Sequence, residues 1–271
     1  MRITHLLAGA ALALVAACGT TVQTTAGADY LARYDGSYDV VAGASGSEVD
    51  GEVRRIAAVE PDIRFPARIG LARIENGRLA AIPEREAEAW AALAEQLDGA
   101  YGEFVPVSPL IAAMVSPAPA DRHGARYAGD TIADIRRGAA RQHLDYVLAY
   151  EVATAHSSRG SAISAADLTV IGMFVLPGRS VQAEAAASGI LIDVRNGYPY
   201  ATLTAFADRR GLSRTINAWE VRQDMLRDAS AKAVLELAGE LGTALELLKV
   251  ASEEKAAAAA NAAQEAAAGA G

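Results

Sequence analysis

The sequence predicts an α/β fold, an α+β sandwich in which helices pack on a mixed sheet and a long helix ends the chain. Segments with helical apolar spacing alternate with β-rich segments between residues 65 and 249. Two β-rich runs, 180–194 and 198–208, also meet across Arg195-Asn196-Gly197, and Asn-Gly between such runs is a strong hairpin signal. The mixed sheet is therefore expected to contain an antiparallel hairpin.

The first elements of the domain follow each other closely. Residues 65–74 form a strand candidate. The helix expected over 83–97 has proline in its first turn, three glutamates near its positive end and apolar residues at helical spacing. Residues 104–110 are extended, and Pro106 favours the edge of a sheet. Residues 37–60 fit no single element.

Residues 130–155 predict a helix followed by a strand. Thr131 with Asp134 forms a candidate capping box at the start of the helix. The strand begins at Asp145, and both sets of alternating side chains in it are apolar. Two apolar faces indicate a central strand that is covered on both sides.

The C-terminal part of the chain predicts a helix over 217–249, followed by an Ala-rich low-complexity tail over 251–271. An apolar stripe defines the helix: Leu226, Ala229, Ala233, Leu237, Leu241, Ala244 and Leu248. Gly239 and Gly242 each cost about 1 kcal/mol relative to alanine, so a bend or split is expected there. The tail is expected to extend the helix to Gly269, and a partner-binding role for it is the alternative.

The N-terminus has the shape of a signal peptide, because its apolar run over residues 6–17 is too short to span a bilayer. Val15-Ala16-Ala17-Cys18 matches the bacterial lipoprotein box. We therefore predict a signal peptide over 1–17 and a diacylglyceryl, palmitate-bearing Cys18. Residues 18–40 are expected to be the lipidated tether and 41–250 a single periplasmic domain. The alternative is a buried cysteine in an apolar helix.

The expected location is the outer membrane, with the domain facing the periplasm. Three acyl chains on Cys18 exceed what stable anchoring requires. Gly19 follows Cys18, whereas an aspartate there retains the enterobacterial lipoproteins that this segment resembles at the inner membrane.

Charge and composition exclude several classes of partner. The formal charge of −8 argues against nucleic acid and against anionic lipid head groups other than through the acyl anchor. No glycine-rich loop with a lysine is present to bind phosphate, so no cofactor is expected.

No catalytic or metal site is expected. The histidines downstream of the signal, His123, His143 and His156, have no metal-ligand spacing. Asp145 and Glu151 share one face of a strand, six residues apart, which is too far for a direct acid–base pair. An envelope hydrolase built on these carboxylates and a histidine is the alternative to a binding protein.

Tyr198, Tyr200 and Phe206 lie two or more residues apart on one face of the second hairpin strand. Aromatic anchors dominate binding hot spots, so these three residues are a candidate docking face. Burial of the same stripe in the core is the other interpretation.

Four segments resemble those of the rhombotarget lipoprotein family: FPARIGLARI, LDYVLAYEV, LTVIGMFVLPG and GILIDVRNG. The layout is also similar to a wider envelope class that includes the curli-secretion lipoprotein, the lipoprotein activators of penicillin-binding proteins and the N-terminal domain of TolB. These resemblances imply an α/β module that binds an envelope protein or assembles with itself, without catalysis. The apolar C-terminal span that a sorting peptidase would recognise is missing from 251–271.

Overall fold

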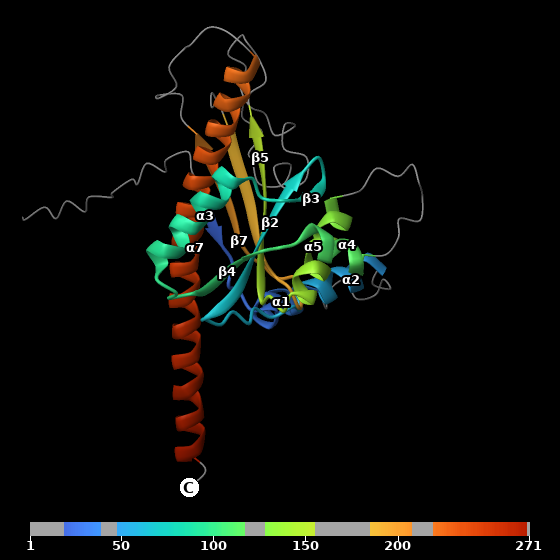
Figure 1. Cartoon of the computed structure of the whole chain (residues 1–271). Coiled ribbons are helices and arrows are strands. Elements are labelled where there is room, and N and C mark those ends of the chain that lie inside the picture. Colours follow the sequence, from blue (N-terminus) through green and yellow to red (C-terminus); the bar gives the residue numbers. More distant parts are fainter. Residues whose placement is uncertain (1–18, 39–47, 117–127, 155–184, 208–218, 270–271) are drawn as a thin grey trace, which may run out of the picture.

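The computed structural model describes residues 19–38, 48–116, 128–154, 185–207 and 219–269 (Figure 1). In these residues seven strands form one mixed sheet with the order β1-β7-β6-β5-β2-β3, and β4 also pairs with β2. The strands are β1 (Gly19–Val22), β2 (Ala67–Glu75), β3 (Arg78–Ala80), β4 (Gly102–Pro106), β5 (Tyr146–Thr154), β6 (Ala185–Asp193) and β7 (Pro199–Ala207). β2 runs parallel to β4 and β5, and the other pairs are antiparallel. The predicted α/β class with a mixed sheet is confirmed.

Helices cover both faces of the sheet (Figure 1). They are α1 (Gly27–Tyr38), α2 (Glu48–Ala57), α3 (Glu84–Leu97), α4 (Pro109–Val115), α5 (Ala128–Arg141) and α7 (Trp219–Gly269). α3 and α7 pack together on one face, and α5 covers the other with α4 beside it. α1 and α2 lie at the end of the sheet where β6 turns into β7.

Strand β5 is central, as its two apolar faces predict. Tyr146, Leu148 and Tyr150 belong to the larger core cluster under α3 and α7. Val147 and Ala149 belong to the smaller cluster under α5. All five side chains are at most 1% exposed, so the strand is shielded on both sides.

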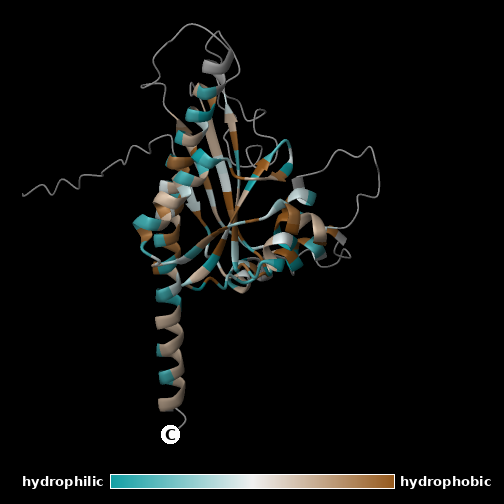
Figure 2. Ribbon diagram, in the orientation of Figure 1, coloured by the Kyte–Doolittle hydropathy of each residue, from teal (hydrophilic) through white to brown (hydrophobic). Residues whose placement is uncertain are grey.

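Helix α7 confirms the predicted stripe and the helical reading of the tail. The stripe from Ala229 to Leu248 is buried against the sheet and α3, whereas every residue from Glu253 to Ala268 is exposed. The expected break at Gly239 and Gly242 is wrong, because the helix runs without interruption to Gly269. Burial of the leucines on both sides of the glycines outweighs the roughly 2 kcal/mol that two glycines cost. In Figure 2 the helix changes from mixed colours along the sheet to a pale brown end with few teal turns.

A buried ion pair joins α3 to the sheet. Arg73 of β2 and Glu86 of α3 are 8% and 2% exposed, and their Nε and Oε2 atoms lie 2.9 Å apart. The Glu86 carboxylate also accepts hydrogen bonds from the hydroxyls of Tyr150 (3.0 Å) and Ser230 (2.8 Å). Burial, together with the negative charge of Glu86, raises the pKa of Tyr150. β2, β5, α3 and α7 therefore meet at one carboxylate.

The capping box predicted at Thr131 is wrong. Helix α5 begins at Ala128, so Thr131 lies inside its first turn. Its hydroxyl donates to the carbonyl oxygen of Gly77, 2.6 Å away in the β2–β3 turn. The threonine thus ties the helix to the sheet instead of capping its own backbone.

The predicted tether over 18–40 is also wrong for the described residues in it. Gly19–Val22 form β1, which pairs with β7 and adds an edge strand to the sheet. Gly27–Tyr38 form α1. The folded domain therefore begins at Gly19 and not near residue 41, because β7 supplies hydrogen-bond partners that a short Thr-rich segment lacks on its own.

Candidate functional site

A cleft of about 690 Å³ lies between α1, α2 and the β6–β7 turn. Gly27, at the start of α1, packs directly on the end of α2. A Cβ at this position would lie 2.5 Å from the carbonyl oxygen of Ala57, so only glycine permits the contact. The next backbone N–H, that of Ala28, donates to Glu60 Oε1 at 2.8 Å. These two contacts set the position of α1 at the side of the cleft.

The β6–β7 turn is organised around Asp193, whose side chain is fully buried. Asp193 Oδ1 accepts from the backbone N–H groups of Arg195 (2.8 Å) and Asn196 (3.3 Å), and Oδ2 accepts from Arg195 Nη2 (2.9 Å). The side-chain hydrogen bond from Arg195 to Asp193 is the main reason that the pKa of Arg195 is raised. Gly197 completes the turn with φ +80°, in the left-handed region that glycine adopts without strain.

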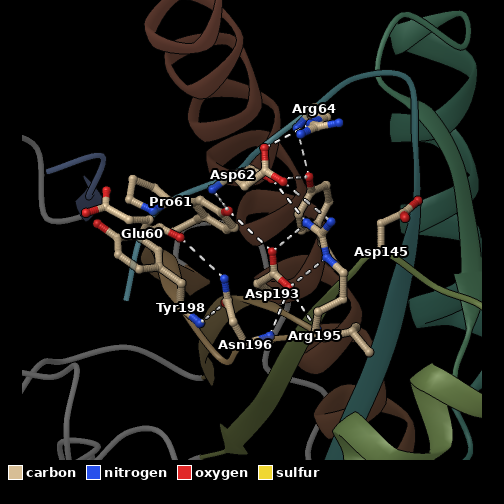
Figure 3. A network of polar contacts seen from close by, with 12 residues as sticks. Glu60, Pro61, Asp62, Arg64, Asp145, Asp193, Arg195, Asn196 and Tyr198 are labelled. Carbon is tan, nitrogen blue, oxygen red and sulfur yellow. Dashed lines mark hydrogen bonds and ion pairs between the residues drawn. The ribbon is translucent and has the colours of Figure 1, made fainter. Parts of the chain in front are cut away.

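The same turn holds the loop that leads into β2 (Figure 3). Arg195 Nη2 donates to the carbonyl oxygen of Asp62 at 3.1 Å, and Asn196 Nδ2 donates to that of Glu60 at 3.3 Å. The backbone N–H of Asp62 donates to the Tyr200 hydroxyl at 2.9 Å. Turn and loop therefore form one hydrogen-bonded unit beside the cleft.

Two tyrosines complete this unit from below. The Tyr146 hydroxyl accepts from the backbone N–H of Arg64 (2.8 Å) and donates to the carbonyl oxygen of Asp62 (3.2 Å). Burial raises the pKa of Tyr146 and, more strongly, that of Tyr200, where the negative charge of Asp193 adds to the effect. Neutral phenols with both donor and acceptor in use hold the backbone in place, and they are poorly suited to transfer protons.

The cleft itself combines apolar walls with positive charge. Tyr30 of α1 and Val53 and Ile56 of α2 line it and remain 42%, 54% and 60% exposed. Its charged lining residues are Arg33 and Arg55, and no carboxylate, histidine or cysteine occurs among the described residues that line it. Such a surface suits binding of an apolar partner that carries negative charge.

Sequence reasoning missed this site. It leaves residues 37–60 unassigned, although Val49, Val53 and Ile56 recur at the i, i+4 and i+7 spacing of one helical face. All three are more than half exposed in α2. That spacing was the available signal, but a stripe in a short helix reads equally well as a core face.

The predicted docking face is wrong for two of its three residues. Tyr198 and Tyr200 are 5% and 0% exposed and belong to the larger core cluster. A register shift opposite Leu191 and Ile192 leaves Tyr200 without a partner residue on β6, so the expected alternation ends there. Phe206 is half-buried.

Tyr198 nevertheless contributes to the cleft. It lines the cleft wall, and its hydroxyl donates to the carbonyl oxygen of Thr25 at 2.9 Å. The tyrosine thereby holds the segment between β1 and α1 against the β6–β7 turn.

The residues of the alternative hydrolase site occupy structural positions. Asp145 Oδ2 accepts from the backbone N–H of Arg68 at 2.8 Å, which joins the start of β5 to β2. Glu151 is 3% exposed within β5, and His143 is exposed just after α5. His123, His156 and the predicted lipidation residue Cys18 lie outside the described residues. No group of three or more metal-binding side chains occurs in the described ranges.

Comparisons with known proteins add little. No family model matches the chain, and no curated protein is similar to it. The PelC dodecamer of Paraburkholderia phytofirmans is 17% identical in one crystal form, covering 65% of this chain and 93% of PelC with a TM-score of 0.28. A second form is 16% identical, with 63% and 87% coverage and a TM-score of 0.24. A bacterial aryl acylamidase of the amidase signature family is 14% identical, with 72% and 50% coverage and a TM-score of 0.20. With TM-scores this low, none of these similarities bears on function.

Proposed function

We propose that the protein is a lipid-anchored lipoprotein of the outer membrane whose periplasmic domain is a binding and assembly module for a cell-envelope complex. The observation that carries the proposal is the lipoprotein box ending at Cys18, directly followed by a strand of the folded domain. The module has no catalytic role in this proposal, since the described cleft lining offers no carboxylate, histidine or cysteine for acid–base or nucleophilic chemistry.

The start of β1 sets how close the domain is to the membrane. Gly19 pairs with Thr204 of β7, and the Thr20 hydroxyl hydrogen-bonds the side chain of Glu240 in α7. Acyl chains on Cys18 would be attached one residue, about 3.8 Å between Cα atoms, from this edge of the sheet. The domain would therefore lie against the membrane instead of hanging from a tether. Among the described helices, none has both the length and the apolar content to cross a bilayer.

The α1–α2 cleft is the proposed docking surface, in place of the Tyr198, Tyr200 and Phe206 face. Its apolar residues Val53 and Ile56 remain exposed in the absence of a partner. The hydrogen-bonded turn beside it gives the surface a rigid border, which lowers the entropy lost on binding.

Membrane fractionation tests the anchor. Metabolic labelling with an acyl-chain analogue is expected to mark the wild-type protein and to place it in the outer-membrane fraction. Cys18→Ala should lose both the label and that location, whereas the exposed β1 variant Thr21→Ala should keep both. Gly19→Asp, where a Cβ meets nothing within 4 Å, should keep the label and move to the inner membrane. Outer-membrane recovery of unlabelled Cys18→Ala contradicts the anchor.

Crosslinking in cells tests the docking surface. Capture of one envelope complex by the wild type should be lost in Val53→Asp and kept in Leu110→Asp, which alters an equally exposed apolar residue on α4. Equal capture by both variants contradicts a docking role for the cleft.

A further inference from the structure

The end of α7 is a second surface without a partner in the described chain. Lys255 Nζ donates to the carbonyl oxygen of Pro61 at 3.2 Å, which is the last printed contact between α7 and the domain. Beyond it the helix continues to Gly269 with every residue through Ala268 exposed. Fourteen residues at 1.5 Å per residue make a rod of about 21 Å that extends away from the sheet (Figure 1).

The rod and the cleft have opposite charges. Residues 253–269 contain three glutamates and one lysine, a net charge of −2, and the C-terminal end of a helix adds a partial negative charge. Arg33 and Arg55 line the cleft without a carboxylate among the described lining residues. Arg55 does form an ion pair with Glu52 (3.6 Å), but both side chains are more than half exposed, so an incoming carboxylate can compete.

The rod and the cleft also fit in size and stiffness. The rod consists mainly of alanine, whose small side chains let another surface approach a helix closely. Val53 and Ile56 offer larger apolar groups to pack against it. Because α7 is already helical before any contact, docking would order few additional residues.

The partner that these surfaces fit is another copy of the chain. Pro61 and Lys255 place the base of the rod at the same end of the domain as the cleft, yet the rod runs straight past α1 and beyond it (Figure 1). A straight helix cannot turn back into the cleft of its own domain. We infer that the Ala256–Gly269 helix of a second copy docks into the α1–α2 cleft, and that reciprocal docking closes a dimer. This inference rests on the proposed role of the cleft as a docking surface.

Cysteine crosslinking between two differently tagged chains tests the inference. The lipidated full-length chain has no free thiol, because Cys18 is its only cysteine. Cells would express one chain with Val53→Cys and the other with Ala262→Cys, and mild oxidation is expected to join the two tags in one disulfide-bonded product. A matched pair replaces Val53→Cys with Leu110→Cys on α4, a site 79% exposed, and should give no product above background.

The arginines provide a second readout. Arg33→Glu with Arg55→Glu in the Val53→Cys chain should lower the crosslink yield about tenfold. Arg78→Glu, an exposed arginine of β3 away from the cleft, should leave the yield unchanged.

The outcomes separate this inference from the proposed function. Equal yields from the Val53→Cys and Leu110→Cys pairs would overturn docking of a second copy. If Val53→Cys is then captured by a different envelope protein, the cleft is still a docking surface and only the inference fails. If Val53→Cys crosslinks to nothing and Val53→Asp retains its partners, both fail.

Discussion

The two parts of α7 differ in what their side chains can reach. From Ala229 to Leu248 the leucines and alanines of one face are buried against β1, β5, β6, β7 and α3. From Glu253 to Ala268 the same helix carries small side chains and contacts little of the domain. Helix propensity is high in both parts, so side-chain volume and not propensity decides which part packs. A helix can therefore be continuous while its energetic roles differ along its length.

The largest effect is expected from Glu86, which joins α3 to the packed part of α7 through Ser230. Glu86→Ala leaves the Arg73 guanidinium buried without its partner, and should lower the free energy of unfolding by about 3–5 kcal/mol. Urea denaturation measures this loss. Glu84→Ala removes an exposed glutamate from the same turn and should cost less than about 1 kcal/mol. Similar losses for both variants would mean that the buried pair contributes nothing specific.

A somewhat smaller loss is expected from Leu241, which is fully buried in the packed part. Leu241→Ala creates a cavity and should cost about 2–5 kcal/mol. Leu247→Ala, at a position 51% exposed on the same helix, is the control and should stay within about 0.5 kcal/mol. The two melting temperatures decide whether packing against the sheet supports this part of the helix.

Gly239→Ala is expected to stabilise the protein. Gly239 lies inside α7, and a Cβ there meets nothing within 4 Å. Alanine should raise the free energy of unfolding by about 0.5–1 kcal/mol, because glycine loses more backbone entropy on folding. A lower melting temperature for this variant would show that the helix needs flexibility at this turn.

The smallest effect on stability is expected from removing the projecting part. Deletion of residues 256–271 takes away no buried side chain, so the free energy of unfolding should change by less than about 0.5 kcal/mol. The same deletion should abolish the crosslink to a second copy. A large loss of stability would show that this part packs on the domain after all, and would remove the contrast within α7.

Local pattern predicted the elements whose signals are complete within a few residues. The two apolar faces of β5 indicate a central strand because alternation alone sets which side chains face which layer. The Asn196-Gly197 turn predicts the hairpin for a similar reason, since few residues adopt positive φ. The α7 stripe follows from helical spacing over more than five turns.

The candidate site was not predictable in the same way. Val53 and Ile56 show the spacing of a core face, and only the absence of a covering element in the fold leaves them exposed. Tyr200 appears to alternate outward in the sequence, but a register shift set by pairing with β6 turns it into the core. Both outcomes depend on neighbours far away in the chain.

By itself, the sequence determined the α/β class, the lipoprotein box prediction, the hairpin and the long helix, because each depends on local spacing or on a short motif. Only the tertiary structure decided that Gly19–Val22 form an edge strand, that Glu86 is buried and that a cleft opens beside α2. The physical reason is that hydrogen-bond partners, charge partners and covering surfaces come from segments distant in sequence. A residue's local pattern does not state which of them it will meet.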